Sequence, residues 1–271
     1  MGHSIRQTER WIKEGRGQGH GSAYRPWLSV QQVLSCGHAH KILGLKTGRL
    51  HHVLSDLEAA CLTVLEFDQD VVDIREQYPL LPSESTHQAA LRLGLRHPMQ
   101  RGTTVPCVLS SDFCVDVRSD RCRAHETAIA VKYTADLSDR RTRERLAIER
   151  EANLMADRQW SLFTEQTIPT TVLHNLKWLR RRTVPAESVD TECVRAFCRC
   201  IHDANRPDKT LETLLQEACS RLELKGTTGL TLLAVAAWYQ YLYIRLDTQI
   251  SERRPLRLAE GPLDLRLLWL I

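Results

Sequence analysis

The spacing of apolar and polar residues predicts a mixed α/β core followed by a helical segment. After Ser55 the apolar residues recur at helical spacing: Leu57, Cys61, Leu62, Val64 and Leu65. Further along, apolar and polar residues alternate as they do in strands, over 71–78, 107–117 and 126–133. A charged helix over 138–157 and a strand over 160–164 then complete the order helix, three strands, helix, strand. This order is typical of an α/β fold.

The last part of the chain follows a different pattern. Residues 183–187 have the composition of a linker, and helices are predicted over 188–203, 208–224 and 229–245. Glycines at 226 and 229 give a helix–turn–helix-like pattern, and 244–250 and 256–258 are candidate strands of a small wing. A winged-helix domain and a plain helical bundle both fit these residues. We therefore expect two domains, 1–182 and 183–271.

The composition is that of a soluble globular protein. Of the 271 residues, 42% are hydrophobic and 26% are charged. No apolar run reaches the roughly 18 residues of a membrane span, and the first residues lack the apolar core of a signal peptide, so a cytoplasmic location without membrane attachment is expected. The nine cysteines are scattered and odd in number, which argues against a disulfide framework. Cys193, Cys198, Cys200 and His202 point in different directions around a predicted helix, which argues against zinc there.

Positive charge is concentrated at the start of the chain. Residues 1–50 contain eight Lys and Arg but two Asp and Glu, whereas the whole chain carries a net charge of +4. A short basic helix over 3–14 is followed by a segment, 14–21, with glycine at every second position, which lets backbone N–H groups approach a phosphate closely. This region is a candidate phosphate-binding surface. A solvated arm and a flexible connector are the alternatives.

Two acids and a lysine stand out as candidate catalytic residues. Glu58 lies in the apolar helix, Asp112 in a strand, and Lys132 at the end of the next strand. A metal-dependent phosphodiesterase needs such a set, because carboxylates hold a hard divalent cation and a lysine positions water and offsets phosphate charge. Glu58 also follows Ser55 at the spacing of a capping box, so a structural role is its alternative. Ala130 stands where Glu or Gln usually accompanies the lysine on the same strand face.

Several ordered sequence blocks give this chain a resemblance to a known family. The blocks are Ile12–Gly21, Lys46–Arg49, His51–Glu58, Asp73–Pro82, Ser111–Phe113 and Val131–Lys132. From about Trp11 to Trp178 the chain resembles the TnsA family, the endonuclease subunits of heteromeric bacterial cut-and-paste transposases. The C-terminal part matches that family only in being helical.

The resemblance implies a restriction-endonuclease-like α/β catalytic domain followed by an α-helical, winged-helix-like domain. It also implies cleavage at the 5′ ends of a transposon with one or two Mg²⁺ ions, for which Mn²⁺ is the expected substitute. A partner TnsB-like transposase cuts and joins the 3′ ends. The other implied partners are transposon-end DNA and a TnsC-like AAA+ ATPase, which the C-terminal region is expected to bind.

The resemblance also assigns roles to individual residues. Glu58 and Asp112 match the family's metal-binding acids, and Lys132 matches its catalytic lysine. Ala130 has no side-chain ligand to offer, so the backbone carbonyls of Ala130 and Val131 are the remaining candidate metal ligands. The candidate DNA contacts are the basic and histidine residues of the N-terminal blocks: Arg16, His20, Lys46, Arg49, His51 and His52.

Ala130 leaves the activity of this exact sequence open. Three explanations compete: the subunit uses fewer side-chain metal ligands, it has naturally low nuclease activity, or it carries an engineered alanine. The intact neighbouring motifs favour the last explanation. The alternative function is a non-catalytic DNA-binding and assembly subunit. A stand-alone repair or restriction nuclease is a third interpretation.

Overall fold

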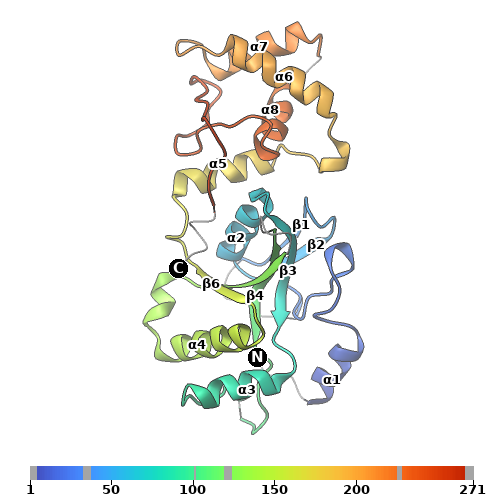
Figure 1. Cartoon of the computed structure of the whole chain (residues 1–271), viewed down its shortest axis with the longest axis vertical. Helices are drawn as coiled ribbons and strands as arrows, with labels where there is room; N and C mark the ends of the chain where they lie inside the picture. The colour runs from blue at the N-terminus through green and yellow to red at the C-terminus, as the bar shows by residue number, and fades with distance from the viewer. Residues whose placement is uncertain (1–4, 33–37, 101, 119–123, 225–227, 266–271) are drawn as a thin grey trace. The chain divides into compact units, whose positions relative to one another are not determined.

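The structure is a computed structural model that describes residues 5–32, 38–100, 102–118, 124–224 and 228–265 (Figure 1). The described residues form two compact units, one ending at Thr167 and the other beginning at Ile168. This division lies before the boundary expected at 182/183. Asn175 gives the physical reason, since its amide bonds to backbone atoms later in the second unit. Its Nδ2 donates to the carbonyl oxygens of Leu246 and Thr248, both at 2.8 Å.

The first unit is a mixed α/β fold, as expected. Its helices and longer strands, in chain order, are α1 (Ile5–Lys13), β1 (His40–Leu43), β2 (Leu50–Val53), α2 (Asp56–Phe67), β3 (Val71–Pro79), α3 (Ser83–Arg92), β4 (Ser110–Val117), β5 (His125–Val131), α4 (Arg140–Met155) and β6 (Gln159–Phe163). The main sheet has the order β3-β4-β5-β6, while β1 and β2 form a separate hairpin (Figure 1). The predicted elements of this region are confirmed, with ends shifted by a few residues.

Burial of apolar side chains explains the packing of these elements. Helix α2 is buried along almost its whole length, as its continuous apolar pattern requires, and it contacts β3 and β5. Helix α4 packs against α3, where Ile148 and Ala152 join a buried cluster with Ala89 and Leu109. Helix α4 also connects the parallel strands β5 and β6, a connection that needs a crossover element.

The register of the sheet brings the reactive side chains to one end of it. The antiparallel β4–β5 ladder ends with Phe113 opposite Ile129. Asp112 precedes Phe113 on β4, and Ala130 follows Ile129 on β5. Asp112 therefore lies at the same end of the ladder as the last residues of β5, and Lys132 comes directly after them.

The buried carboxylate of Glu76 joins the β1–β2 hairpin to β3. Its Oε1 accepts hydrogen bonds from Nη1 of Arg49 at 2.8 Å and from the backbone N–H of His52 at 3.0 Å. Its Oε2 lies 2.8 Å from Nδ1 of His51, and both of these side chains are fully buried. Burial by itself raises the pKa of Glu76, but the hydrogen bonds from His51 and Arg49 outweigh burial and lower that pKa to about 2.

The second unit is helical. Its helices are α5 (Thr170–Arg180), α6 (Thr191–Ala204), α7 (Leu211–Arg221) and α8 (Thr228–Trp238). Helices α6, α7 and α8 pack against one another, which confirms the predicted helical character. In place of two wing strands, the described residues show one isolated antiparallel bridge between Ile244 and Leu258. The winged-helix assignment of this unit therefore stays a prediction.

None of the helices in the described ranges combines the length and the apolar character needed to cross a membrane.

We expect Glu76→Gln to destabilise the first unit by about 3–5 kcal/mol, because it leaves buried cationic partners without their carboxylate. The pH dependence follows from the lowered pKa of Glu76, which is about 2 in the fold and 4.5 in the unfolded chain. Its stabilising contribution is present above pH 4.5 and is lost as the pH falls towards 2. Urea unfolding of wild type and variant across this pH range measures both effects. The exposed Glu84, substituted by Gln, is the control, and equal acid sensitivity of wild type and Glu76→Gln would contradict this role.

Candidate active site

The start of helix α2 fixes the position of Glu58. Ser55 is the N-cap residue, and its Oγ accepts a hydrogen bond from the N–H of Glu58 at 3.1 Å. The carboxylate of Glu58 bonds back, because its Oε2 accepts from the N–H of Leu54 at 2.8 Å. Gln77 of β3 donates its side-chain amide to the same oxygen at 3.1 Å. The capping role therefore holds this carboxylate in place and does not exclude a role in a site.

Asp112 and Lys132 form an ion pair at the end of the β4–β5 ladder. Oδ2 of Asp112 accepts from Nζ of Lys132 at 2.9 Å and from the N–H of Val131 at 2.6 Å. The lysine also donates to the carbonyl oxygen of Val131 at 2.7 Å. Burial lowers the pKa of Lys132, but the charge and hydrogen bond of Asp112 outweigh burial, so the net shift is upward. Lys132 is therefore held in its charged form.

Glu58 lies within electrostatic reach of this ion pair. Its residue is 7% exposed. Burial first, and then the negative charge of Asp112, raise the pKa of Glu58 to about 8, against the opposing effect of Lys132. The structure thus brings together the three residues that the sequence singled out from a helix and two strands. Two acids share one lysine there, so without a further cation the buried Glu58 favours its protonated form.

Ala130 and Val131 line the same end of β5. Ala130 is completely buried and pairs with Leu162 of β6 in the parallel ladder. The carbonyl oxygen of Val131 already accepts from Lys132. A carbonyl oxygen has two lone pairs, so the carbonyl oxygen of Val131 can accept one further bond besides that from Lys132.

Glu149 of α4 is a further acid at this site. It is 8% exposed, and burial, followed by the charge of Asp112, raises its pKa to about 7. Its Oε1 accepts from Nε1 of Trp160 at 3.3 Å. The charge of Glu149 also helps to raise the pKa of Lys132. Glu149 therefore faces the ion pair of Asp112 and Lys132.

The sequence interpretation overlooked Glu149 because it lies in a highly charged helix. The spacing of apolar residues along this helix could have revealed Glu149, because it lies three residues after Leu146 and three before Ala152. Both apolar residues are buried on α4, as is Glu149 itself. A charged residue at an apolar position of the helical pattern is the feature that marks it.

Three of the candidate DNA contacts are used inside the fold. Arg49 and His51 bind the carboxylate of Glu76. Nζ of Lys46 donates to the carbonyl oxygens of Asp68 and Val71, and burial lowers the pKa of Lys46 to about 8. These three side chains already have protein partners, so their positions do not support the expected contact with DNA.

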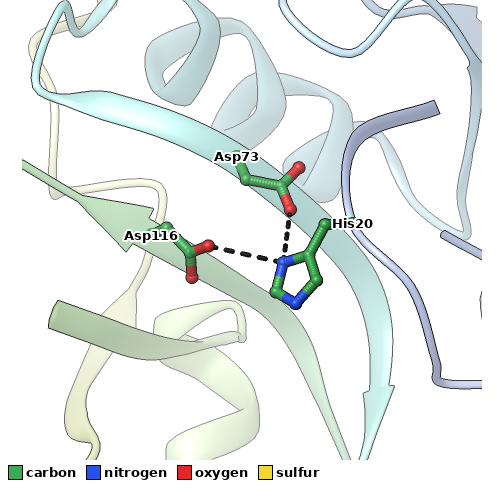
Figure 2. Close-up of side chains that lie close together, drawn as sticks. All are labelled: His20, Asp73 and Asp116. Atoms are coloured by element: carbon green, nitrogen blue, oxygen red, sulfur yellow. Dashed lines mark hydrogen bonds and ion pairs between the residues drawn. The ribbon is translucent and has the colours of Figure 1, made fainter. Parts of the chain in front are cut away.

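The other candidates differ in exposure. Arg16 lies over the ring of Trp11, 4.2 Å from its centroid, and donates to Oε1 of Gln32 at 2.8 Å. His52 is half-buried, and its Nδ1 accepts from the N–H of Val30 at 3.3 Å. The side chain of His20 is 68% exposed and lies beside two acids, as Figure 2 shows.

The glycine-rich segment 14–21 is a packed loop. Gly17 has a φ of +75°, and a Cβ there would lie 2.2 Å from Cγ of Pro79 on β3. Gly19 has a φ of +90°, and a Cβ there would lie 2.7 Å from the carbonyl oxygen of Ala23. At both positions, only glycine can adopt a positive φ and leave room for the neighbouring atoms without strain. The flexible-connector alternative is therefore wrong.

Comparisons with known proteins show the family to which this chain belongs. Residues 68–165 match a family model described as TnsA-like endonuclease N terminal. The chain is also 45% identical over 196 residues to "Transposon Tn7 transposition protein TnsA" of Escherichia coli, an alignment that covers 72% of this chain and 69% of that protein. The chain belongs to the TnsA family. Residues 68–165 therefore correspond to a TnsA-like endonuclease domain, and the α/β unit is compatible with the restriction-endonuclease-like fold expected for TnsA.

For this TnsA-family protein we expect Glu149→Gln to lower the rate of DNA cleavage by about ten- to hundredfold. This is the usual effect of removing an outer group that orients the ligands of a metal site. Gln keeps the size and the hydrogen-bonding capacity of the side chain but removes its charge. Strand-cleavage rates with the assembled transposase measure the effect. Glu151→Gln is the matched control, since Glu151 lies on the same helix and pairs with the exposed Arg92. Equal rates for the two variants would remove Glu149 from the site.

Proposed function

We propose that this chain is the Mg²⁺-dependent subunit that cleaves the 5′ ends of a transposon, together with a TnsB-like transposase that cuts and joins the 3′ ends. The observation that carries the proposal is the convergence of Glu58, Asp112 and Lys132 from three different elements. Phosphodiester hydrolysis needs acids that hold a divalent cation beside a cation that offsets phosphate charge.

The donor set fits a hard divalent cation. Burial and the nearby charge of Asp112 raise the pKa of Glu58, and a cation bound beside both acids would offset that cost. Oδ1 of Asp112 receives no hydrogen bond from any described residue, whereas Oδ2 holds Lys132 and Val131. Glu58 and Asp112 would hold the ion, with the carbonyl oxygen of Val131 as a further donor. When bound, Mg²⁺ supplies an activated water and polarises the scissile phosphate.

Lys132 supports the reaction through its position. Its ammonium group is fixed between the carboxylate of Asp112 and the carbonyl oxygen of Val131. Its side chain is 33% exposed, so one side of the group faces outward, where DNA would lie. A fixed positive charge there stabilises the charge that builds up on a phosphate during hydrolysis.

The partners of this chain follow from its family. The relative is a Tn7 transposition protein, which supports transposon-end DNA and a TnsB-like transposase as partners here. We assign contact with a TnsC-like AAA+ ATPase to the helical second unit. In the first unit, the exposed basic residues of α1, Arg6 and Lys13, are better placed for phosphate contacts than Arg49 and His51, which pair with Glu76.

Asp112→Ala should lower 5′-strand cleavage at least about a thousandfold, because a lost metal ligand and a released Lys132 remove several kcal/mol of transition-state stabilisation. Circular dichroism and binding to the TnsB-like partner should stay unchanged. The measurement is strand-specific cleavage of transposon-end DNA by the full set of transposition proteins. Asp136→Ala, at an exposed acid, is the control.

The same experiment tests the two alternative functions. If wild type and Asp112→Ala give equally little 5′ cleavage while transposition complexes still assemble, the chain is a non-catalytic assembly subunit. If wild type cleaves without any partner, the chain is a stand-alone nuclease. Partner-dependent cleavage that Asp112→Ala abolishes supports the proposal.

Ala130→Gln and Ala130→Glu should raise Mg²⁺-dependent cleavage and lower the Mg²⁺ concentration it needs. A polar side chain at position 130 restores the ligand that the family pattern usually has there, and Glu adds charge as well as an oxygen atom. Cleavage rates across a Mg²⁺ titration compare the three proteins. Because Ala130 is completely buried, thermal unfolding of each variant checks that the longer side chain is accommodated. Identical Mg²⁺ dependence in three folded proteins would contradict the missing-ligand explanation.

A further inference from the structure

Two acids lie directly opposite each other on neighbouring strands, away from the residues proposed for catalysis. Asp73 of β3 pairs with Asp116 of β4 in the antiparallel ladder. Like charges in such a pair normally destabilise a sheet. His20 from the glycine-rich segment reaches over both acids, as Figure 2 shows. Its Nδ1 lies 3.3 Å from Oδ2 of Asp73 and 3.6 Å from Oδ2 of Asp116.

Each of the two carboxylates has one oxygen atom held by neighbouring donors other than His20, while Oδ2 of Asp73 makes a long hydrogen bond with Nδ1 of His20. Oδ1 of Asp73 accepts from the backbone N–H groups of Gly21 at 3.1 Å and Ile74 at 2.8 Å. Oδ1 of Asp116 accepts from Nη2 of Arg75. These bonds fix both carboxylates and leave both Oδ2 atoms directed at the imidazole. Outer contacts of this kind orient the ligands of metal sites.

The separations suit a metal site better than a set of hydrogen bonds. Charge-assisted N–H···O bonds are about 2.7–2.9 Å long, shorter than both distances from Nδ1 of His20. In a tetrahedral site with ligand distances of about 2.0–2.2 Å, neighbouring ligand atoms are about 3.3–3.6 Å apart. The nitrogen and the two oxygen atoms all lie within 4.8 Å of one another.

Arg75 provides a second indication of a missing ligand. Its residue is 3% exposed, and its Nε has no hydrogen-bond acceptor among the described residues. This Nε lies 3.8 Å from Oδ2 of Asp73, beyond hydrogen-bonding distance. A buried donor normally has an acceptor. A water molecule held by an ion on the two Oδ2 atoms would supply one.

We propose that His20, Asp73 and Asp116 bind one divalent transition-metal ion of the Zn²⁺ type, with a water molecule as the fourth ligand. An imidazole nitrogen favours Zn²⁺ over Mg²⁺, which prefers oxygen ligands alone. Asp116 follows Asp112 by four residues on β4, so the ion lies roughly 13 Å along the strand from the catalytic residues. It neutralises the facing acids and fastens the glycine-rich segment to the sheet.

The test uses the metal-free full chain, Zn²⁺ as the probe in calorimetry, and Co²⁺ as a spectroscopic probe. The chain with Glu58→Gln and Asp112→Asn serves as the background, because it lacks the proposed Mg²⁺ ligands. We expect this background to bind one Zn²⁺, to unfold at a higher temperature with it, and to give the visible absorption of tetrahedral Co²⁺. Adding His20→Gln or Asp116→Asn should weaken Zn²⁺ binding at least about tenfold and abolish the Co²⁺ absorption.

The choice of variants separates a metal site from an ion pair. Gln at position 20 can still donate a hydrogen bond to the acids but is a poor metal ligand, and His20 is exposed, so the substitution leaves the core intact. His174→Gln, at an exposed histidine of the second unit, is the matched control and should keep full Zn²⁺ binding. Zn²⁺ binding by the background that His20→Gln leaves unchanged, or no Zn²⁺ binding by the background, would overturn the proposal. Neither result bears on DNA cleavage by wild type, which tests the proposed function separately.

Discussion

A carboxylate buried away from water needs cationic and hydrogen-bonding partners, and Glu76 obtains them from the β1–β2 hairpin. Arg49, His51 and the backbone of His52 all bind it. Removing any of these partners would leave a charge in a poorly solvated place, so the hairpin has one favourable position on β3. Two residues separate the end of this hairpin at Val53 from the start of helix α2 at Asp56. The placement of Glu58 therefore depends on the contact that Glu76 makes.

Other polar residues of strand β3 also hold neighbouring segments in place. Gln77 holds the carboxylate of Glu58, and Asp73 binds the backbone of the glycine-rich segment at Gly21. One strand thus positions the hairpin, helix α2 with Glu58, and the N-terminal segment through polar contacts. Gln77 has a φ of +49°, an uncommon value for a residue with a side chain. The strand departs from regular geometry at the residue that touches the site.

The candidate active site concentrates negative charge around one lysine. Glu58 and Glu149 approach Asp112 and Lys132 from two different helices, and burial raises the pKa of both glutamates. Such an arrangement costs stability in the free protein, and a divalent cation with a phosphate would relieve it. The excess of acids over cations is therefore consistent with an endonuclease that binds metal and DNA together.

The sequence by itself determined the order of helices and strands, because the periods of apolar residues differ between them. It also singled out Glu58, Asp112 and Lys132 as candidate site residues, since polar groups in or next to apolar elements stand out along the chain. The blocks that carry the family resemblance are equally local. These features need no knowledge of which segments lie side by side.

Only the tertiary structure decided which charges meet. Arg49 and His51 are residue types that are typical of DNA-binding surfaces. They nevertheless pair with Glu76, which lies more than twenty positions away in the sequence. Glu149 lies within electrostatic range of Asp112 because α4 packs beside the strands that it connects, and His20 reaches Asp73 because a loop packs on β3. A side chain has the same chemical groups in any surroundings, but its ionisation and its role depend on burial and on its partners. Those partners come from distant parts of the chain, which local patterns do not specify.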